Sequence, residues 1–136
     1  MEKITVGAEI KNVETVTDFV NGVLERFGCP PKAVIQIDVV IDELFSNIAY
    51  YAYAPEEGSA TISIDVKEDP LSVIISFADK GKPFDPLSMK EPDTALSADE
   101  RQIGGLGIFL VKKTMDSVSY EYKDGQNILT VKKVMK

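Results

Sequence analysis

Histidine is absent from this 136-residue chain. Its absence removes the usual general base, the commonest metal-ligating side chain and any imidazole that could accept a phosphoryl group. Catalytic chemistry in this protein would therefore have to use carboxylates, hydroxyls and a metal ion.

Cysteine and positive charge are also scarce. The single cysteine, Cys29, excludes an intrachain disulfide. The sequence has no apolar run of about 20 residues and no basic-then-apolar leader, so we expect no membrane span and a cytoplasmic location.

Fifteen Lys and Arg against 22 Asp and Glu give a net charge of −7. This charge argues against direct nucleic-acid binding, which depends on clustered basic residues, and favours protein or small-molecule partners.

The remaining composition is globular. Apolar residues make up 44% and charged residues 27% of a chain with the length of one ordinary domain. We find no internal repeat and no low-complexity tract. We therefore expect one domain over residues 1–136.

Hydrophobic periodicity predicts the order strand, helix, helix, strand, strand, loop, helix, strand, strand. The helices are expected after Asn12 as N-cap and from Pro31 to about residue 53, with a third one opening at the glycines near 104. The strands are expected at residues 3–10, 59–67, 71–79, 117–123 and 126–134, the last two as a hairpin around Asp124 and Gly125. This order predicts an α+β fold, a two-layer α/β sandwich with helices on one face of a mixed, mostly antiparallel sheet.

Asp79 continues the inward phase of one predicted strand, after Val73, Ile75 and Phe77. A buried ionised carboxylate is costly unless a donor bonds to it, and the amino group of adenine is one suitable donor. Alternatively, the strand has already ended and Asp79 only begins a turn with Gly81. Glycine fits either interpretation, in a turn or where a ligand approaches the backbone closely.

Glu43 and Asn47 lie one helical turn apart, opposite the apolar stripe of the second helix. An amide oxygen can help to hold Mg²⁺, and a carboxylate one turn away can accept a proton from an attacking hydroxyl. Neighbouring Asp42 is a competitor for the role of base. Alternatively, the pair belongs to a solvated helix face.

Gly104, Gly105 and Gly107 lead directly into the third helix, where free backbone donors favour phosphate. The segment lacks the Lys-Ser/Thr ending of a P-loop, and no GxGxxG follows a strand. Taken alone it could be a flexible hinge. The three motifs in this order together favour a nucleotide site.

With these motifs the chain resembles the GHKL (Bergerat-fold) ATPase superfamily, and within it the anti-sigma-factor serine/threonine kinases. The segment ELFSNIAYYAY resembles the N box, DKGKPFDP the first glycine box and GGLGIFLVKKTMD the second. The chain departs from the family pattern at Tyr51, where many relatives have histidine, and at Pro83, which replaces a second glycine.

The resemblance implies ATP and Mg²⁺ as cofactors. Asn47 is then the magnesium ligand, Glu43 the general base for a serine hydroxyl, and Asp79 the acceptor for the adenine amino group beside Gly81. The further implied residues are Thr130 as a hydroxyl assisting at adenine, Arg101 as a phosphate contact, and Gly104, Gly105, Leu106 and Gly107 at the phosphate end. Residues 85–103 are the implied ATP lid.

The resemblance also implies a function. The protein is expected to be an ATP-dependent protein serine kinase that phosphorylates an anti-sigma-factor antagonist and sequesters a sigma factor, with a homodimer as a further expectation. The alternative is a non-catalytic switch that senses ATP or ADP and grips a partner protein. A histidine-kinase catalytic domain is a third interpretation, but without a phosphoacceptor histidine this chain could act only in trans.

Overall fold

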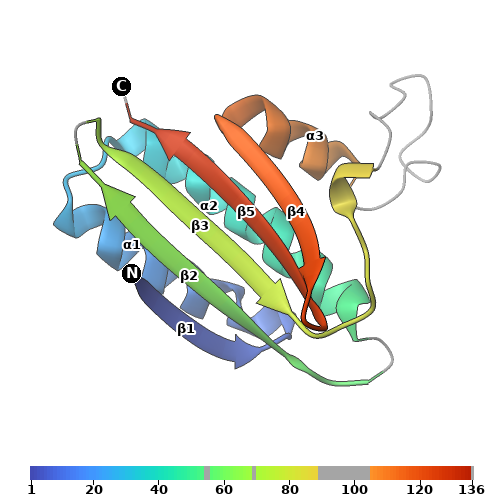
Figure 1. The fold of residues 1–136 in the computed structure, drawn as a ribbon. Helices are drawn as coiled ribbons and strands as arrows, with labels where there is room; N and C mark the ends of the chain where they lie inside the picture. The colour runs from blue at the N-terminus through green and yellow to red at the C-terminus, as the bar shows by residue number, and fades with distance from the viewer. Residues whose placement is uncertain (54–55, 69, 89–104, 136) are drawn as a thin grey trace.

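The computed structural model describes residues 1–53, 56–68, 70–88 and 105–135. These residues form two layers, a five-stranded sheet and three helices that cover one of its faces (Figure 1). The strands are β1 (Glu2–Gly7), β2 (Ser59–Lys67), β3 (Ser72–Asp79), β4 (Ser117–Lys123) and β5 (Gln126–Val134), in the spatial order β1-β2-β3-β5-β4. The α+β sandwich expected from the sequence is confirmed.

All four strand pairings in the described part of the chain are antiparallel, so the expected mixed component of the sheet is absent there. The reason is the position of the last hairpin. After β3 the chain crosses over through α3, and β5, not β4, pairs with β3. The second strand of this hairpin, β5, therefore runs antiparallel to β3. The first strand, β4, forms the edge of the sheet.

The helices are α1 (Val13–Arg26), α2 (Pro31–Asn47) and α3 (Gly105–Thr114). Pro31 opens α2, where its missing N–H costs nothing. Beyond α2 the expected helix continues only as one π-helical turn, η2 (Ile48–Ala52). Asn12 is the N-cap residue of α1 as expected, but its side chain makes no capping hydrogen bond, and its Nδ2 donates instead to the carbonyl of Gly7 at 2.8 Å. Two 3₁₀ turns, Ile10–Asn12 and Pro86–Ser88, complete the elements. No helix in the described ranges is long and apolar enough to cross a membrane.

The hairpin between β4 and β5 turns at Asp124 and Gly125, which have φ values of 54° and 77°. Two successive residues with positive φ are what a two-residue type I′ turn requires, and Asp-Gly is one of the pairs that adopt it at low cost. This turn was expected from the sequence, and it sets the register of β4 against β5, with Lys123 opposite Gln126. In the separate pairing of β5 with β3, Asn127 lies opposite Asp79.

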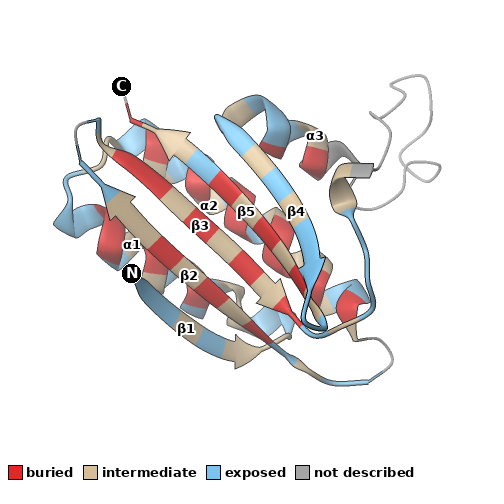
Figure 2. Cartoon of the chain, viewed as in Figure 1, coloured by how far each residue is buried: buried red, intermediate tan, exposed pale blue. Residues whose placement is uncertain are grey.

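The core lies between the layers. On β3 the inward side chains Val73, Ile75 and Phe77 are each about 1% exposed, and Asp79 follows them at 6% (Figure 2). Asp79 is therefore the last residue of a buried strand phase, and the alternative in which the strand ends earlier is wrong.

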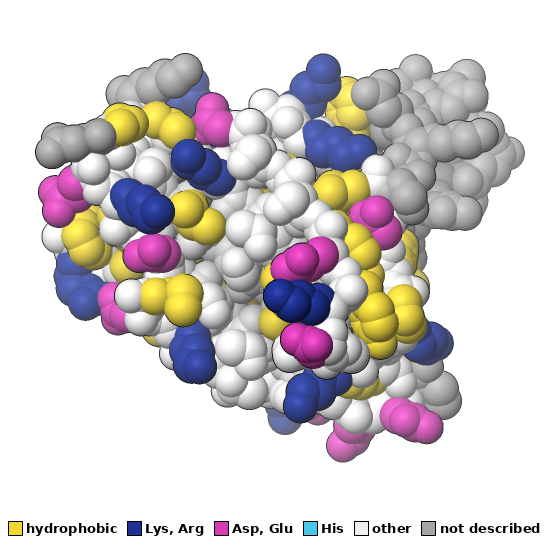
Figure 3. All heavy atoms as spheres, in the orientation of Figure 1, with side chains coloured by type: hydrophobic (Ala, Val, Ile, Leu, Met, Phe, Trp, Pro, Cys, Tyr) yellow, Lys and Arg dark blue, Asp and Glu magenta, His cyan; other side chains and the backbone are white. Residues whose placement is uncertain are grey.

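None of the described helices lies over the other face of the sheet, and Figure 3 looks onto this face. Hydrophobic, charged and uncharged polar side chains are mixed there, and no charge of one sign dominates. Hydroxyl pairs link neighbouring strands, Ser76 with Thr130 at 3.0 Å and Thr5 with Thr61 at 2.8 Å.

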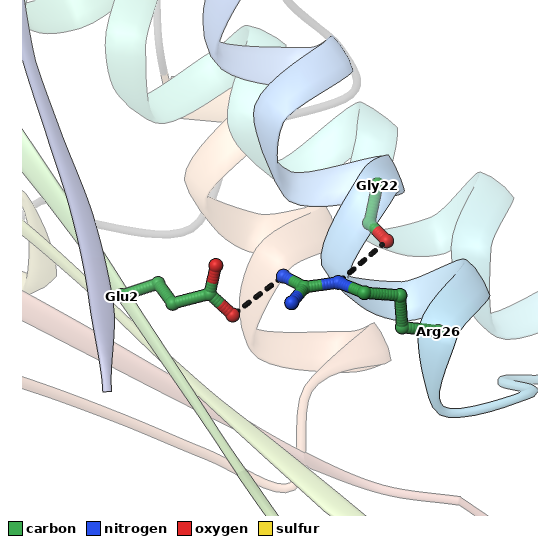
Figure 4. Close-up of polar contacts among 3 residues, drawn as sticks. All are labelled: Glu2, Gly22 and Arg26. Carbon is green, nitrogen blue, oxygen red and sulfur yellow. Dashed lines mark hydrogen bonds and ion pairs between the residues drawn. The ribbon is translucent and has the colours of Figure 1, made fainter.

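An ion pair joins the edge strand β1 to the end of α1. The Nη2 of Arg26 lies 2.5 Å from Oε2 of Glu2, and Nε of Arg26 donates to the carbonyl of Gly22 at 3.4 Å (Figure 4). Both side chains are about half exposed. Exposed pairs contribute at most about 1 kcal/mol, so β1 is held mainly by its pairing with β2.

Candidate functional site

A cavity of about 650 Å³ opens between the end of α2, the turn η2 and the ends of β3, β4 and β5. Its walls are mainly apolar, with contributions from Leu44, Ile48, Phe77 and Leu129. Its polar lining includes Asn47, Asp79 and Asn127. A mostly apolar cavity with a few convergent polar groups is typical of a small-ligand site.

Asp79 is held firmly at one end of this cavity. Its Oδ1 accepts a hydrogen bond from the backbone N–H of Gly81 at 2.9 Å and another from Nδ2 of Asn127 at 3.0 Å. No hydrogen bond among the described residues uses Oδ2. The predicted acceptor is therefore in the cavity and fixed in orientation.

Position 81 requires glycine because of the surrounding backbone, independently of any ligand. A Cβ at this position would lie 2.2 Å from the backbone oxygen of Ala52, so no other residue fits without moving the backbone. The neighbouring N–H of Lys82 donates to that same oxygen at 2.9 Å, and the N–H of Lys80 donates to the hydroxyl of Tyr53 at 2.7 Å. The loop after β3 is thereby attached to η2, the turn that follows α2, the helix that carries Glu43.

Asn127 is the site residue that the sequence reasoning missed. It is 7% exposed, and its Nδ2 donates to the carbonyls of Lys82 at 2.8 Å and Gly81 at 3.4 Å as well as to Asp79. Its Oδ1 accepts from the N–H of Phe84 at 3.0 Å and from the hydroxyl of Tyr120. The signal that could have found it is the phase of β5, in which Asn127 shares the buried face with Leu129 and Val131.

Thr130 does not reach the cavity, so its predicted role at adenine is wrong for this structure. Side chains alternate along a strand, and Leu129 and Val131 already occupy the inward positions on either side of it. Thr130 therefore faces the open side of the sheet, where its hydroxyl bonds to Ser76 at 3.0 Å.

Glu43 and Asn47 are brought together in the last turns of α2, where Asn47 lines the cavity and Glu43 lies directly behind it as its hydrogen-bond partner. The Nδ2 of Asn47 donates to Oε1 of Glu43 at 3.3 Å. Both side chains are half-buried, so the alternative of a fully solvated helix face is wrong. Neighbouring Asp42 is exposed, whereas Glu43 is half-buried beside Gly107 and bonded to Asn47, which weakens the case of Asp42 as the base.

The first turn of α3 covers Glu43. A Cβ on Gly107 would lie 1.9 Å from Cδ of Glu43, so the glycine leaves the space that the carboxylate occupies. Burial raises the pKa of Glu43, the hydrogen bond from Asn47 opposes this shift, and the negative charge of Asp42 adds to it. A carboxyl group with a raised pKa is a stronger proton acceptor once ionised.

The remaining predicted residues are only partly described. Gly105 and Leu106 form the beginning of α3 together with Gly107. Gly104 and Arg101 lie outside the described residues, as does the predicted lid apart from residues 85–88.

The donor set fits a purine nucleotide. Apolar walls suit a base, and Asp79 presents an acceptor in the cavity lining. With Nδ2 of Asn47 directed at Glu43, its Oδ1 is the atom available to a cation. No group of three or more acidic or cysteine side chains that could hold a metal occurs in the described ranges. A magnesium ion here would take most of its ligands from phosphates and water, as Mg²⁺ commonly does.

A family described as "Histidine kinase-like ATPase domain" matches residues 6–133 of the chain. The serine-protein kinase RsbW of Listeria monocytogenes serovar 1/2a is 31% identical over 117 residues, which cover 82% of this chain and 73% of the relative. The serine/threonine-protein kinase BtrW of Bordetella bronchiseptica is 34% identical over 90 residues, which cover 66% of this chain and 63% of the relative.

Two crystal structures support the fold. The RsbU and RsbW domains of a Mycobacterium tuberculosis protein match 99% of this chain and 33% of that one, with a TM-score of 0.69 and 15% identity. The SiaB-SiaC complex of Pseudomonas aeruginosa matches 97% of this chain and 89% of the matched chain, with a TM-score of 0.59 and 19% identity. At these identities the likeness concerns the fold alone.

Proposed function

Since the chain belongs to the histidine kinase-like ATPase domain family, we propose that it is an ATP-dependent protein serine kinase that also acts as an anti-sigma factor. It phosphorylates a serine of an anti-sigma-factor antagonist protein, and it sequesters a sigma factor. The observation that carries the proposal is a cavity lined by the fixed, buried carboxylate of Asp79 and by Asn47, whose amide is hydrogen-bonded to the half-buried carboxylate of Glu43. The relatives named serine-protein kinases support the choice of acceptor.

Asp79 and the apolar walls bind the base in this proposal. The carboxylate accepts a hydrogen bond from the exocyclic amino group, and Phe77 and Leu129 exclude water from the faces of the ring. A hydrogen bond to a charged acceptor contributes about 1.5–3 kcal/mol, enough to distinguish adenine from a base without the amino group.

The other end orients the reacting groups. Bound Mg-ATP supplies the phosphoryl group and the cation that neutralises its charge. Asn47 offers its Oδ1 to the cation, and Glu43 takes the proton of the attacking serine hydroxyl. Gly104, Gly105, Leu106, Gly107 and Arg101 remain predicted contacts of the phosphates, supported by the start of α3 beside Glu43.

The test is phosphoryl transfer from labelled Mg-ATP to a candidate antagonist protein. Removal of a general base costs about 10²- to 10⁴-fold, so Glu43→Gln should lower the transfer rate by this factor. Its affinity for ADP should stay within about threefold of the parent, because Glu43 does not touch the base end. The matched control is Asp42→Asn, which removes the adjacent but exposed carboxylate.

Transfer by Glu43→Gln at the parental rate would show that the base is assigned wrongly. Tight nucleotide binding by the parent protein without transfer to any antagonist would favour instead the non-catalytic ATP/ADP-sensing switch.

A further inference from the structure

We propose that Asn127 is a positioning residue that fixes the Asp79 carboxylate for the base, and that it thereby sets the preference of the cavity for adenine over purines without the amino group. This inference rests on the proposed function, because it takes an adenine nucleotide as the ligand of the cavity.

The side chain of Asn127 holds together groups from two strands and the loop between β3 and α3. The amide of Asn127 bonds to the end of β3 at Asp79, to three residues of the following loop at Gly81, Lys82 and Phe84, and to β4 at Tyr120. It uses both its donor and its acceptor, which only Asn and Gln side chains offer in one planar group. A purely apolar residue would leave the loop carbonyls at this buried position without their donor.

Asn127 also fixes the orientation of the Asp79 carboxylate. Nδ2 of Asn127 and the N–H of Gly81 both bond to Oδ1, at 3.0 and 2.9 Å. These two donors hold the carboxylate plane and leave Oδ2 as the oxygen that no hydrogen bond of the described residues occupies. An acceptor that is already oriented loses less entropy when the ligand binds, so the gain from the amino group is larger.

Asn127 is itself part of the cavity wall. The cavity is lined by Asn127 itself and by its partners Asp79, Lys82, Phe84 and Tyr120. Any change in this amide therefore shifts the groups around the base end. In the part of the chain that the structure describes, neither Glu43 nor Asn47 has a hydrogen bond with Asn127.

The experiment measures two affinities for each protein by isothermal titration, one for Mg-ADP and one for the Mg-bound diphosphate of purine riboside, which lacks the 6-amino group. The variants are Asn127→Ala, Tyr120→Phe and Thr130→Val. Tyr120→Phe removes only the hydroxyl that donates to Asn127, and Thr130→Val is the matched control on the opposite face of the same strand. Thermal melts establish that each variant is folded.

The parent should prefer ADP by about 10- to 100-fold, the factor that one hydrogen bond to a charged acceptor gives. In Asn127→Ala the preference should fall to about threefold or less, in Tyr120→Phe it should fall to an intermediate value, and in Thr130→Val it should match the parent. A merely structural role would weaken both ligands equally and leave the ratio unchanged.

An unchanged ratio in a folded Asn127→Ala protein would overturn the inference. If that variant does not fold, Tyr120→Phe decides, since a parental ratio there would overturn the inference in the same way. Failure of the parent to bind ADP, or to prefer it, would instead contradict the proposed function, so the two failures are distinguishable.

Discussion

The Asp79 end and the Glu43 end of the cavity satisfy their polar groups in different ways. At the Asp79 end, Asp79 and Asn127 are 6% and 7% exposed, and the carboxylate of Asp79 accepts hydrogen bonds of 2.9 and 3.0 Å from Gly81 and Asn127. At the Glu43 end, the carboxylate and the amide of Asn47 are half-buried and share one hydrogen bond of 3.3 Å. Asp79 and Asn127 resemble buried polar groups of a core, whose hydrogen bonds are made within the protein. Glu43 and Asn47 resemble groups of a reaction site, which are partly exposed and have few partners.

This difference separates binding from catalysis. Groups that are densely bonded and buried contribute to the stability of the fold, so changes at the Asp79 end should affect nucleotide affinity and unfolding together. Groups with few bonds can change partners during a reaction, so changes at the Glu43 end should affect turnover with little loss of stability. Three predictions test this separation.

Asp79→Ala should give the largest effect. It removes the acceptor for adenine and leaves the N–H of Gly81 without its partner. We expect ADP affinity to fall by about 100-fold or more and the free energy of unfolding to fall by about 1–3 kcal/mol. Titration calorimetry and denaturant melts measure the two quantities, with Asp42→Asn as control. Unchanged affinity would remove the distinction between the two ends.

Gly107→Ala should give a smaller and more selective effect. The new Cβ would occupy the position of the Glu43 carboxylate, which is the flexible end of its side chain and can move aside. We expect phosphoryl transfer to fall by about 10- to 100-fold, because a shift of about 1 Å in a reacting group costs that much.

The matched control for Gly107→Ala is Gly22→Ala on α1, where a Cβ meets no atom within 4 Å. This control should transfer at the parental rate and be more stable by about 0.5–1 kcal/mol. Equal transfer rates for the two alanine variants would show that Gly107 does not position Glu43.

The smallest effect concerns pH. Burial raises the pKa of Glu43 above its unfolded value, so its contribution to stability is present below the unfolded pKa and is lost as pH rises through the folded pKa. Glu43→Gln resembles the protonated form. The variant should therefore become more stable relative to the parent as pH rises from about 4, and the difference should then level off above the folded pKa. Denaturant melts across this range measure it, and a difference independent of pH would contradict the raised pKa.

Local pattern was enough to predict the elements and the inward position of Asp79. Strict alternation along β3 and the Asp-Gly pair before β5 depend only on neighbouring residues. The helical period predicts that Glu43 lies opposite the apolar stripe of α2. One helix alone cannot show that α3 packs over Glu43, because that contact depends on tertiary structure.

Asn127 lines the cavity beside Asp79 in place of Thr130, the hydroxyl expected to assist at adenine, for two reasons. The resemblance to a family motif assigned the hydroxyl by its residue type, whereas the phase of β5 determines which side chains face the cavity. The bond between Asn127 and Asp79 also depends on the register of two strands 48 residues apart, which local sequence does not specify.

The central claim is that Asp79 receives the base and that the Asn47 end receives the phosphates. A crystal structure of the protein with Mg-ADP tests it most directly. The account predicts the exocyclic amino nitrogen of adenine within about 3 Å of the Asp79 carboxylate and the phosphates beside Asn47. A base bound outside this cavity, with Asp79 contacting only Gly81 and Asn127, would contradict it.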